Sequence, residues 1–195
     1  MNLPPRIVLM RHGRPAVVLS GRLEAAGLGP LAKAYQASGI VDTPATETSE
    51  MVQNFGIIFC SSLPRSRQSA RALGVGDRAV ADPLFDEARL PYFGGGRVRL
   101  SVGLWLTVLR WLWLAGFSRN GESFVAAKLR ARLAATRLVE CAQTCGDVLL
   151  VGHGLLNHLI AQELRAKGWI GPAKLMRDYW SLGVFTPPKG WPYCN

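Results

Sequence analysis

The 195-residue sequence has little of what metal centres, disulfide frameworks and repetitive chains are built from. It contains three histidines and four cysteines, and no cysteine pair or cysteine–histidine cluster has zinc-like spacing. Its 21 glycines and 12 prolines follow no period, which excludes collagen-like and low-complexity chains. It also offers no carboxylate cluster for two metal ions. These patterns predict no metal site, and no cofactor is expected.

Acidic residues are scarce as well. Thirteen Asp and Glu face 23 Lys and Arg, which gives a net charge of +10. This excess predicts attraction to anions, whether phosphorylated metabolites, nucleic acid or acidic membrane, without choosing among them. The basic residues are scattered and not interleaved with aromatic ones, so we expect no nucleic-acid partner. A 49% hydrophobic share excludes wholesale disorder.

The cysteines and the first residues bear on the compartment. Cys60, Cys141, Cys145 and Cys194 are expected to be reduced thiols, mostly buried. Residues 1–14 show no basic segment followed by an apolar one, so no secretory signal is predicted. We therefore expect a cytoplasmic protein.

One apolar run is long enough to resemble a membrane span. Residues 101–117 read S-V-G-L-W-L-T-V-L-R-W-L-W-L-A-G-F. The run is short for a bilayer helix of about 20 residues, and Arg110 lies in its middle, so no membrane span is expected. We predict an apolar helix buried in the protein or in a homodimer contact. A lid over a binding site and a membrane-surface helix remain alternatives, which Trp105, Trp111 and Trp113 also suit.

Elsewhere, strand-like and helix-like segments alternate along the chain. Strands are predicted at 6–10, 56–60, 78–81, 148–151 and within 176–185, and helices at 23–38, 64–73, 121–141 and 155–167. This alternation predicts one α/β domain over residues 1–195, a three-layer α/β/α sandwich with a mainly parallel central sheet. The segment near 100–120 is its apolar helical insertion or lid.

Details within these segments lead to narrower expectations. Gly27, Gly29 and Pro30 are expected to break the first helix early. In the helix that starts near 121, Phe124, Leu129 and Leu133 are expected on one side. The proline-rich tail, residues 186–195, is expected to be loose.

Two of the three histidines occupy matching positions. His12 follows the predicted strand I-V-L-M-R, His153 follows V-L-L-V-G, and Gly13 and Gly154 come directly after them. Side chains just past the carboxyl ends of neighbouring parallel strands face one crevice. If these two strands are neighbours, the histidines meet there, and the glycines allow backbone to approach a ligand closely. Two histidines in the same context predict a functional pair.

Arginines beside these positions predict an anion site. Arg11 precedes the first histidine, and Arg65 lies at a predicted helix start in C-S-S-L-P-R-S-R-Q-S-A. Helix N-termini and arginine side chains both suit phosphate oxygens. Of Arg67 and Arg71, at least one is expected to be a solvated surface charge. Arg14 is a further candidate for substrate contact.

Three blocks in this order resemble the histidine phosphatase superfamily, which has the phosphoglycerate-mutase-like fold. The blocks are R-H-G after the first strand, S-S-L-P-R-S-R-Q-S-A after the second and G-H-G after a late strand. The resemblance implies that His12 accepts a phosphoryl group, forming a phosphohistidine. It also implies that Arg11, Arg65 and His153 form the phosphate pocket, to which Gly13 and Gly154 contribute backbone.

The resemblance further implies a carboxylic acid that protonates the leaving group. The segment L-F-D-E-A-R-L-P-Y-F-G-G nominates Glu87. Asp86 and Glu122 are rivals, the latter in a G-E-S segment that also resembles the family. A surface carboxylate paired with Arg89 is the alternative for Glu87.

The sequence thus predicts a metal-independent phosphomonoesterase that acts on a small phosphorylated substrate. A neutral imidazole is a competent nucleophile toward phosphorus, provided that its other ring nitrogen donates to a backbone carbonyl. A phosphoglycerate-type mutase is the first alternative, although the Asn that mutases carry after R-H-G is absent. A non-catalytic phosphate-binding or scaffold protein is the second.

Overall fold

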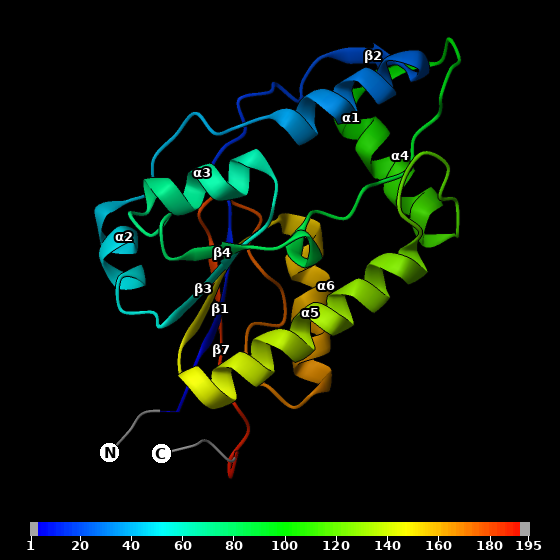
Figure 1. Ribbon diagram of the computed structural model, residues 1–195. Coiled ribbons are helices and arrows are strands. Elements are labelled where there is room, and N and C mark those ends of the chain that lie inside the picture. Colours follow the sequence, from blue (N-terminus) through cyan, green and yellow to red (C-terminus); the bar gives the residue numbers. More distant parts are fainter. Residues whose placement is uncertain (1–3, 192–195) are drawn as a thin grey trace.

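A five-stranded sheet with the order β4-β3-β6-β1-β7 forms the centre of the computed structural model, which describes residues 4–191 (Figure 1). Its strands are β1 (Ile7–Arg11), β3 (Ile57–Cys60), β4 (Ala79–Ala81), β6 (Val148–Gly152) and β7 (Leu182–Phe185). The first four run parallel, whereas β7 pairs antiparallel to β1. The predicted mainly parallel sheet is confirmed, and its last strand is the exception.

Helices cover both faces of this sheet, because successive strand residues point to opposite sides. Val8 and Met10 pack toward α2 (Thr46–Val52) and α3 (Pro64–Ala72). Ile7 and Leu9 belong to the cluster on the other face, which α5 (Phe124–Cys145) and α6 (Gly154–Ala166) cover. The three-layer α/β/α architecture is therefore confirmed (Figure 1).

A smaller unit stands beside these layers (Figure 1). It contains α1 (Leu28–Ala37), α4 (Val102–Leu114) and a two-stranded sheet of β2 (Arg22–Glu24) and β5 (Arg99–Ser101). Short 3-10 turns, η1 (Ala25–Gly27) and η2 (Pro83–Phe85), lead into α1 and out of β4. A hydrophobic cluster that includes Leu28 and Leu109 joins α1 to α4.

The apolar run forms a helix, α4, as predicted, but only one side of it is buried within the described part of the chain. Trp105 and Trp113 are almost fully buried, and their indole N–H groups donate to the carbonyls of Leu23 (2.8 Å) and Glu122 (2.7 Å). Trp111, on the other side, is 70% exposed. Within residues 4–191 no helix is both long and apolar enough to cross a membrane. The homodimer contact stays a prediction.

Two expectations about helices were wrong. Residues 23–38 do not form one helix: the expected early break is present after Gly27, but residues 22–24 pair with β5, and Gly29 and Pro30 lie in the first turn of α1 and do not break it. Proline suits this position, where no intrahelical N–H bond is lost. Leu129 and Leu133 are exposed, and α5 instead buries a row of alanines against its neighbours. Small side chains let α5 lie close to α6 and the sheet.

The tail and the cysteines also differ from expectation. Thr186 pairs with Ile170, and the Trp191 ring lies 5.7 Å from that of Trp169, so the tail is packed as far as residue 191. Residues 192–195 lie outside the described part, Cys194 among them. Cys60 is buried, but Cys145 is exposed.

Candidate active site

The two predicted histidines meet at the carboxyl ends of β1 and β6. These strands are parallel neighbours with Arg11 opposite Gly152, so the residues that follow them face each other. The His12 and His153 rings are 5.0 Å apart, centroid to centroid, at 62°. Asn157 fixes this junction, because its amide donates to the Met10 carbonyl (2.9 Å) and accepts from the His153 N–H (3.3 Å).

His12 has one possible neutral tautomer. The Arg65 guanidinium can only donate, so its Nε–H contact of 3.3 Å requires that His12 Nε2 accepts. His12 Nδ1 therefore carries the proton and donates to the Gly13 carbonyl at 2.6 Å. Burial lowers the pKa of His12 to about 3; the Gly13 carbonyl opposes this shift, and Arg65 and Arg11 add to it. The imidazole is thus neutral at physiological pH, with its lone pair on Nε2.

We expect nitrogen NMR of ring-labelled protein to show this directly. Between pH 5 and 7.5, His12 should remain neutral in the Nδ1–H form, because its pKa lies near 3. His12→Asn identifies its signals by their disappearance. A His12 titration near 6.5, the ordinary value for histidine, would contradict the buried hydrogen-bonding arrangement.

His153 presents an unpartnered nitrogen to the same place. Its Nε2 lies 2.6 Å from the Ser61 hydroxyl, which also accepts from the Leu63 N–H (3.2 Å). Its Nδ1 is buried without a hydrogen-bond partner among the described residues. Burial lowers the pKa of His153 well below the ordinary value, and Arg65 adds to the effect. When Ser61 donates to Nε2, neutral His153 carries its proton on Nδ1, ready for an acceptor.

Two arginines bring positive charge to these rings without a carboxylate partner. Arg65 is 1% exposed, stacks 4.3 Å over the Tyr35 ring and donates to the Tyr35 carbonyl (2.9 Å). Burial lowers its pKa. Arg11 donates to the Arg177 carbonyl, while its Nε is buried and unpartnered. In residues 4–191 neither arginine forms a salt bridge. Buried charges are normally paired, so this cluster is complementary to an anion.

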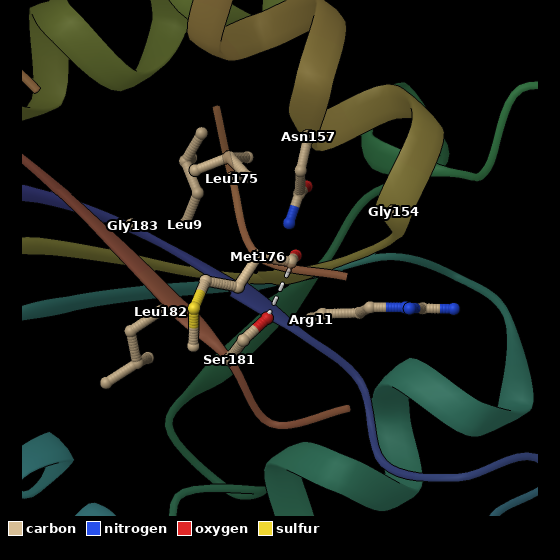
Figure 2. A pocket seen from close by; sticks show the side chains of 9 residues that line it. All are labelled: Leu9, Arg11, Gly154, Asn157, Leu175, Met176, Ser181, Leu182 and Gly183. Carbon is tan, nitrogen blue, oxygen red and sulfur yellow. Dashed lines mark hydrogen bonds between the residues drawn. The ribbon is translucent and has the colours of Figure 1, made fainter. Parts of the chain in front are cut away.

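The segment between α6 and β7 covers this cluster. The Tyr179 ring lies 4.3 Å from the Arg11 guanidinium carbon and 5.9 Å from the His12 ring. In Figure 2 the Arg11 side chain extends past the start of α6 at Gly154, and the Ser181 hydroxyl holds the turn through the Met176 carbonyl (3.2 Å). This segment thereby fixes where the Arg11 guanidinium lies.

Of the three candidate acids, Glu87 alone has no side-chain partner in the described chain. Its carboxylate accepts from the backbone N–H groups of Leu156 (2.9 Å), Ala88 (3.0 Å) and Leu155 (3.3 Å). It therefore caps the start of α6, just after His153, and no ion pair with Arg89 forms.

The rivals are engaged in structural contacts. Asp86 holds the hydroxyl and N–H of Ser62 (2.8 Å each). Glu122 forms a bidentate pair with Arg130 (2.7 and 2.9 Å). Side chains thus hold both oxygens of each rival, whereas Glu87 is held by backbone N–H groups.

Other nominated residues lie differently. Arg14 is exposed near Asp42, 4.0 Å away, and does not line the cavity that Arg11 and Arg65 line. A β-carbon on Gly13 would collide with the Trp180 ring, so this glycine makes room for packing. At Gly154 a β-carbon would lie 3.5 Å from Arg11 Nε, which is ordinary contact. Arg67 and Arg71 are both exposed, which confirms that this helix carries surface charge.

A cavity of about 1110 Å³ opens at this cluster. Arg11, Arg65, Glu87 and Gly154 line one end of it, and leucines of α1 and α4 line the other. Within the described part of the chain, no group of three His, Cys, Asp or Glu is placed to hold a metal ion. Arg11 and Arg65 thus face a large cavity, whereas the fully buried His12 and His153 lie behind them and do not line it.

The family model of the histidine phosphatase superfamily (branch 1) matches residues 7–191. The chain belongs to this superfamily. Its members are phosphatases and mutases, and the three sequence blocks that suggested the assignment are the ones that converge here. A comparison with curated proteins gave no match.

Several solved structures share the fold. An open reading frame product of Mycobacterium tuberculosis has a TM-score of 0.63 at 19% identity, covering 95% of this chain and 93% of that one. A phosphoserine phosphatase variant from Entamoeba histolytica, in complex with phosphoserine, has a TM-score of 0.61 at 16% identity, covering 92% of this chain and 89% of that one. A mycobacterial glucosyl-3-phosphoglycerate phosphatase has a TM-score of 0.58 at 22% identity, covering 82% of this chain and 79% of that one.

Sequence reasoning missed the residues that hold the site together. Tyr35 and Tyr179 come from segments with no motif, and their rings reach the arginines only through the tertiary fold. Ser61 was detectable, because it directly follows the second predicted strand. Asn157 was detectable too, since it lies four residues after His153 and one helical turn places it beside that residue.

Proposed function

We propose that this protein hydrolyses a phosphomonoester through a phosphohistidine at His12, in steps that need no metal. One observation carries the proposal: Arg11, Arg65 and the unpartnered Nδ1 of His153 gather beside the unprotonated Nε2 of His12, and neither arginine forms a salt bridge within residues 4–191. A phosphoryl group supplies the missing negative charge and the acceptors for the unpartnered nitrogens. Membership of a superfamily of phosphatases and mutases supports this reading.

In the first step, the phosphoryl group replaces the contact between Arg65 and His12 Nε2. The Nε2 lone pair attacks phosphorus, the bond to the leaving oxygen breaks, and that oxygen takes a proton from Glu87. Arg65, Arg11 and the Nδ1–H of His153 stabilise the charge on the phosphoryl oxygens. The Gly13 carbonyl accepts the Nδ1–H of His12 and balances the positive charge that develops on this ring.

In the second step, water attacks the phosphohistidine from the cavity side. Glu87, now ionised, takes the proton of this water, and the phosphorus–nitrogen bond breaks. His12 returns to its neutral form, and inorganic phosphate leaves. If an alcohol of a second substrate replaced the water, the same site would act as a mutase.

The proposal is tested with a panel of phosphorylated metabolites and phosphate release as the readout. The best substrate is then used, in labelled form, to trap an acid-labile phosphoenzyme. Phosphate release with such an intermediate supports hydrolysis, and transfer to an alcohol supports a mutase. Tight phosphate binding with neither outcome would establish a non-catalytic binding protein.

Glu87→Gln tests the acid. The amide keeps the shape of the side chain and cannot give a proton, so phosphoenzyme formation from an alkyl phosphate should slow about 10²–10⁴-fold. An aryl phosphate has a good leaving group, and its reaction should slow much less. Rapid-quench kinetics with both substrates measures this contrast.

Asp86→Asn and Glu122→Gln are the comparison variants, because both carboxylates have structural partners. Neither variant should slow phosphoenzyme formation more with the alkyl phosphate than with the aryl phosphate. Equal losses for alkyl and aryl phosphates in Glu87→Gln would mean that its role is to cap α6.

A further inference from the structure

The cavity at the anion cluster is larger than a small polar phosphate ester requires. Its volume is about 1110 Å³, whereas clefts for small organic ligands usually measure about 300–1,000 Å³. It starts at Arg11 and Arg65 and continues between α1, α4 and α6. A ligand held at the arginines therefore has its organic part inside this space.

Apolar side chains at helical spacing line much of this space. On α1 and on α4, the lining side chains recur at positions i, i+3 and i+7, the spacing that places them on one side of a helix. The first turns of α6 complete the wall. The residues that form it are Leu28, Leu31 and Tyr35 on α1, Leu106, Leu109 and Trp113 on α4, and Leu155 and Leu159 on α6.

Many of the polar side chains in the cavity already have hydrogen-bond partners within the chain. The pairs are Glu122 with Arg130 (2.7 and 2.9 Å), Asn120 with the Tyr92 carbonyl (3.0 Å), and His158 with Gln162 (3.1 Å). Arg89 and Arg110 also line the cavity, but both are exposed at its rim. Gln36, which is partly buried, and Arg177, which is exposed, line the cavity as well, so the polar groups near the leucines that could bind the hydroxyl groups of a sugar or a glycerol are few.

We infer that the substrate is the phosphomonoester of a long apolar alcohol. Its phosphate binds at Arg11, Arg65 and His153, and its hydrocarbon chain lies between the leucines of α1 and α4. This inference rests on the proposed function, because it names the substrate class for the same site. α4, the segment expected to be a lid or a buried helix, is then the wall that selects the substrate.

The inference is tested with n-alkyl phosphates of two to ten carbons, each below its micelle concentration, and with glycerol 3-phosphate. Burying one methylene favours binding by up to about fourfold. We expect kcat/KM to rise about two- to fourfold per methylene until the cavity is filled. The kcat/KM for glycerol 3-phosphate should be close to that for ethyl phosphate.

Variants locate the effect on the cavity wall. Leu31→Asn and Leu106→Asn should each lower kcat/KM for octyl phosphate about tenfold and leave ethyl phosphate within about twofold, since only the longer chain reaches them. Leu104→Asn is the matched control on α4, because Leu104 is 48% exposed and does not line the cavity. Leu104→Asn should leave kcat/KM unchanged for both octyl phosphate and ethyl phosphate. Retained activity on ethyl phosphate also shows that the variants fold.

The outcomes separate this inference from the proposed function. A flat response to chain length, or glycerol 3-phosphate as the better substrate, overturns the apolar substrate while hydrolysis stands. If no ester is hydrolysed and no phosphoenzyme forms, hydrolysis fails. Affinity of the unmodified protein for the same series then decides the inference, and it is overturned if octyl phosphate binds no more tightly than inorganic phosphate.

Discussion

His12→Ala should abolish turnover and phosphoenzyme together. The only other histidine in the cluster, His153, has its Nε2 engaged by Ser61 at 2.6 Å, and its Nδ1 is placed to donate. No second unprotonated nitrogen is therefore placed to replace Nε2 of His12. Loss of a covalent nucleophile lowers kcat by on the order of 10⁵–10⁶-fold in a well-studied hydrolase. Labelled-substrate quench and steady-state phosphate release measure the two effects.

Binding provides the control for this variant. Arg11, Arg65 and His153 remain in His12→Ala, so inorganic phosphate should still bind with an affinity close to that of the unmodified protein. Calorimetric titration measures it, and retained binding shows that the site has folded. If turnover persisted while the phosphoenzyme disappeared, direct attack by water would replace the covalent mechanism.

The centre of the fold and of the site was predictable because both depend on short-range patterns. Continuous apolar runs such as 148–151 mark strands that are buried on both faces, and parallel sheets place the following residues at one edge. Once β1 and β6 are neighbours, His12 and His153 have to meet. The antiparallel β7 does not follow from its own sequence, because strand direction depends on how the preceding segment returns to the sheet.

The rest depended on contacts between distant segments. The strand pairing of β2 with β5 joins residues about 80 positions apart and converts the start of a predicted helix into an edge strand. The leucines of α5 predicted the wrong buried side of this helix: Leu129 and Leu133 are exposed, and alanines pack against α6, where space is short. No local signal placed Tyr35 under Arg65 or Tyr179 beside Arg11, although these rings fix both guanidinium groups.

Arg65→Met removes a charge that is 1% exposed, has no salt bridge within residues 4–191, and contacts His12, the proposed nucleophile. We expect kcat/KM to fall about 10²–10⁴-fold, because a positioned donor to the phosphoryl oxygens is lost. Arg67→Met on the same helix is the matched control, since Arg67 is exposed to solvent. It should leave kcat/KM unchanged.

Stability then distinguishes a binding role for Arg65 from a structural one. If Arg65 stabilised the fold, its removal would lower the stability of the folded state. A buried charge without a salt-bridge partner instead destabilises the folded state, and burial accordingly lowers the pKa of Arg65. We therefore expect the Tm of Arg65→Met to equal or exceed that of the unmodified protein without phosphate. Phosphate should raise the Tm of the unmodified protein, because it binds the folded state, and should raise that of Arg65→Met much less. A lower Tm with an unchanged response to phosphate would assign Arg65 to the core, leaving Arg11 and His153 to hold the anion.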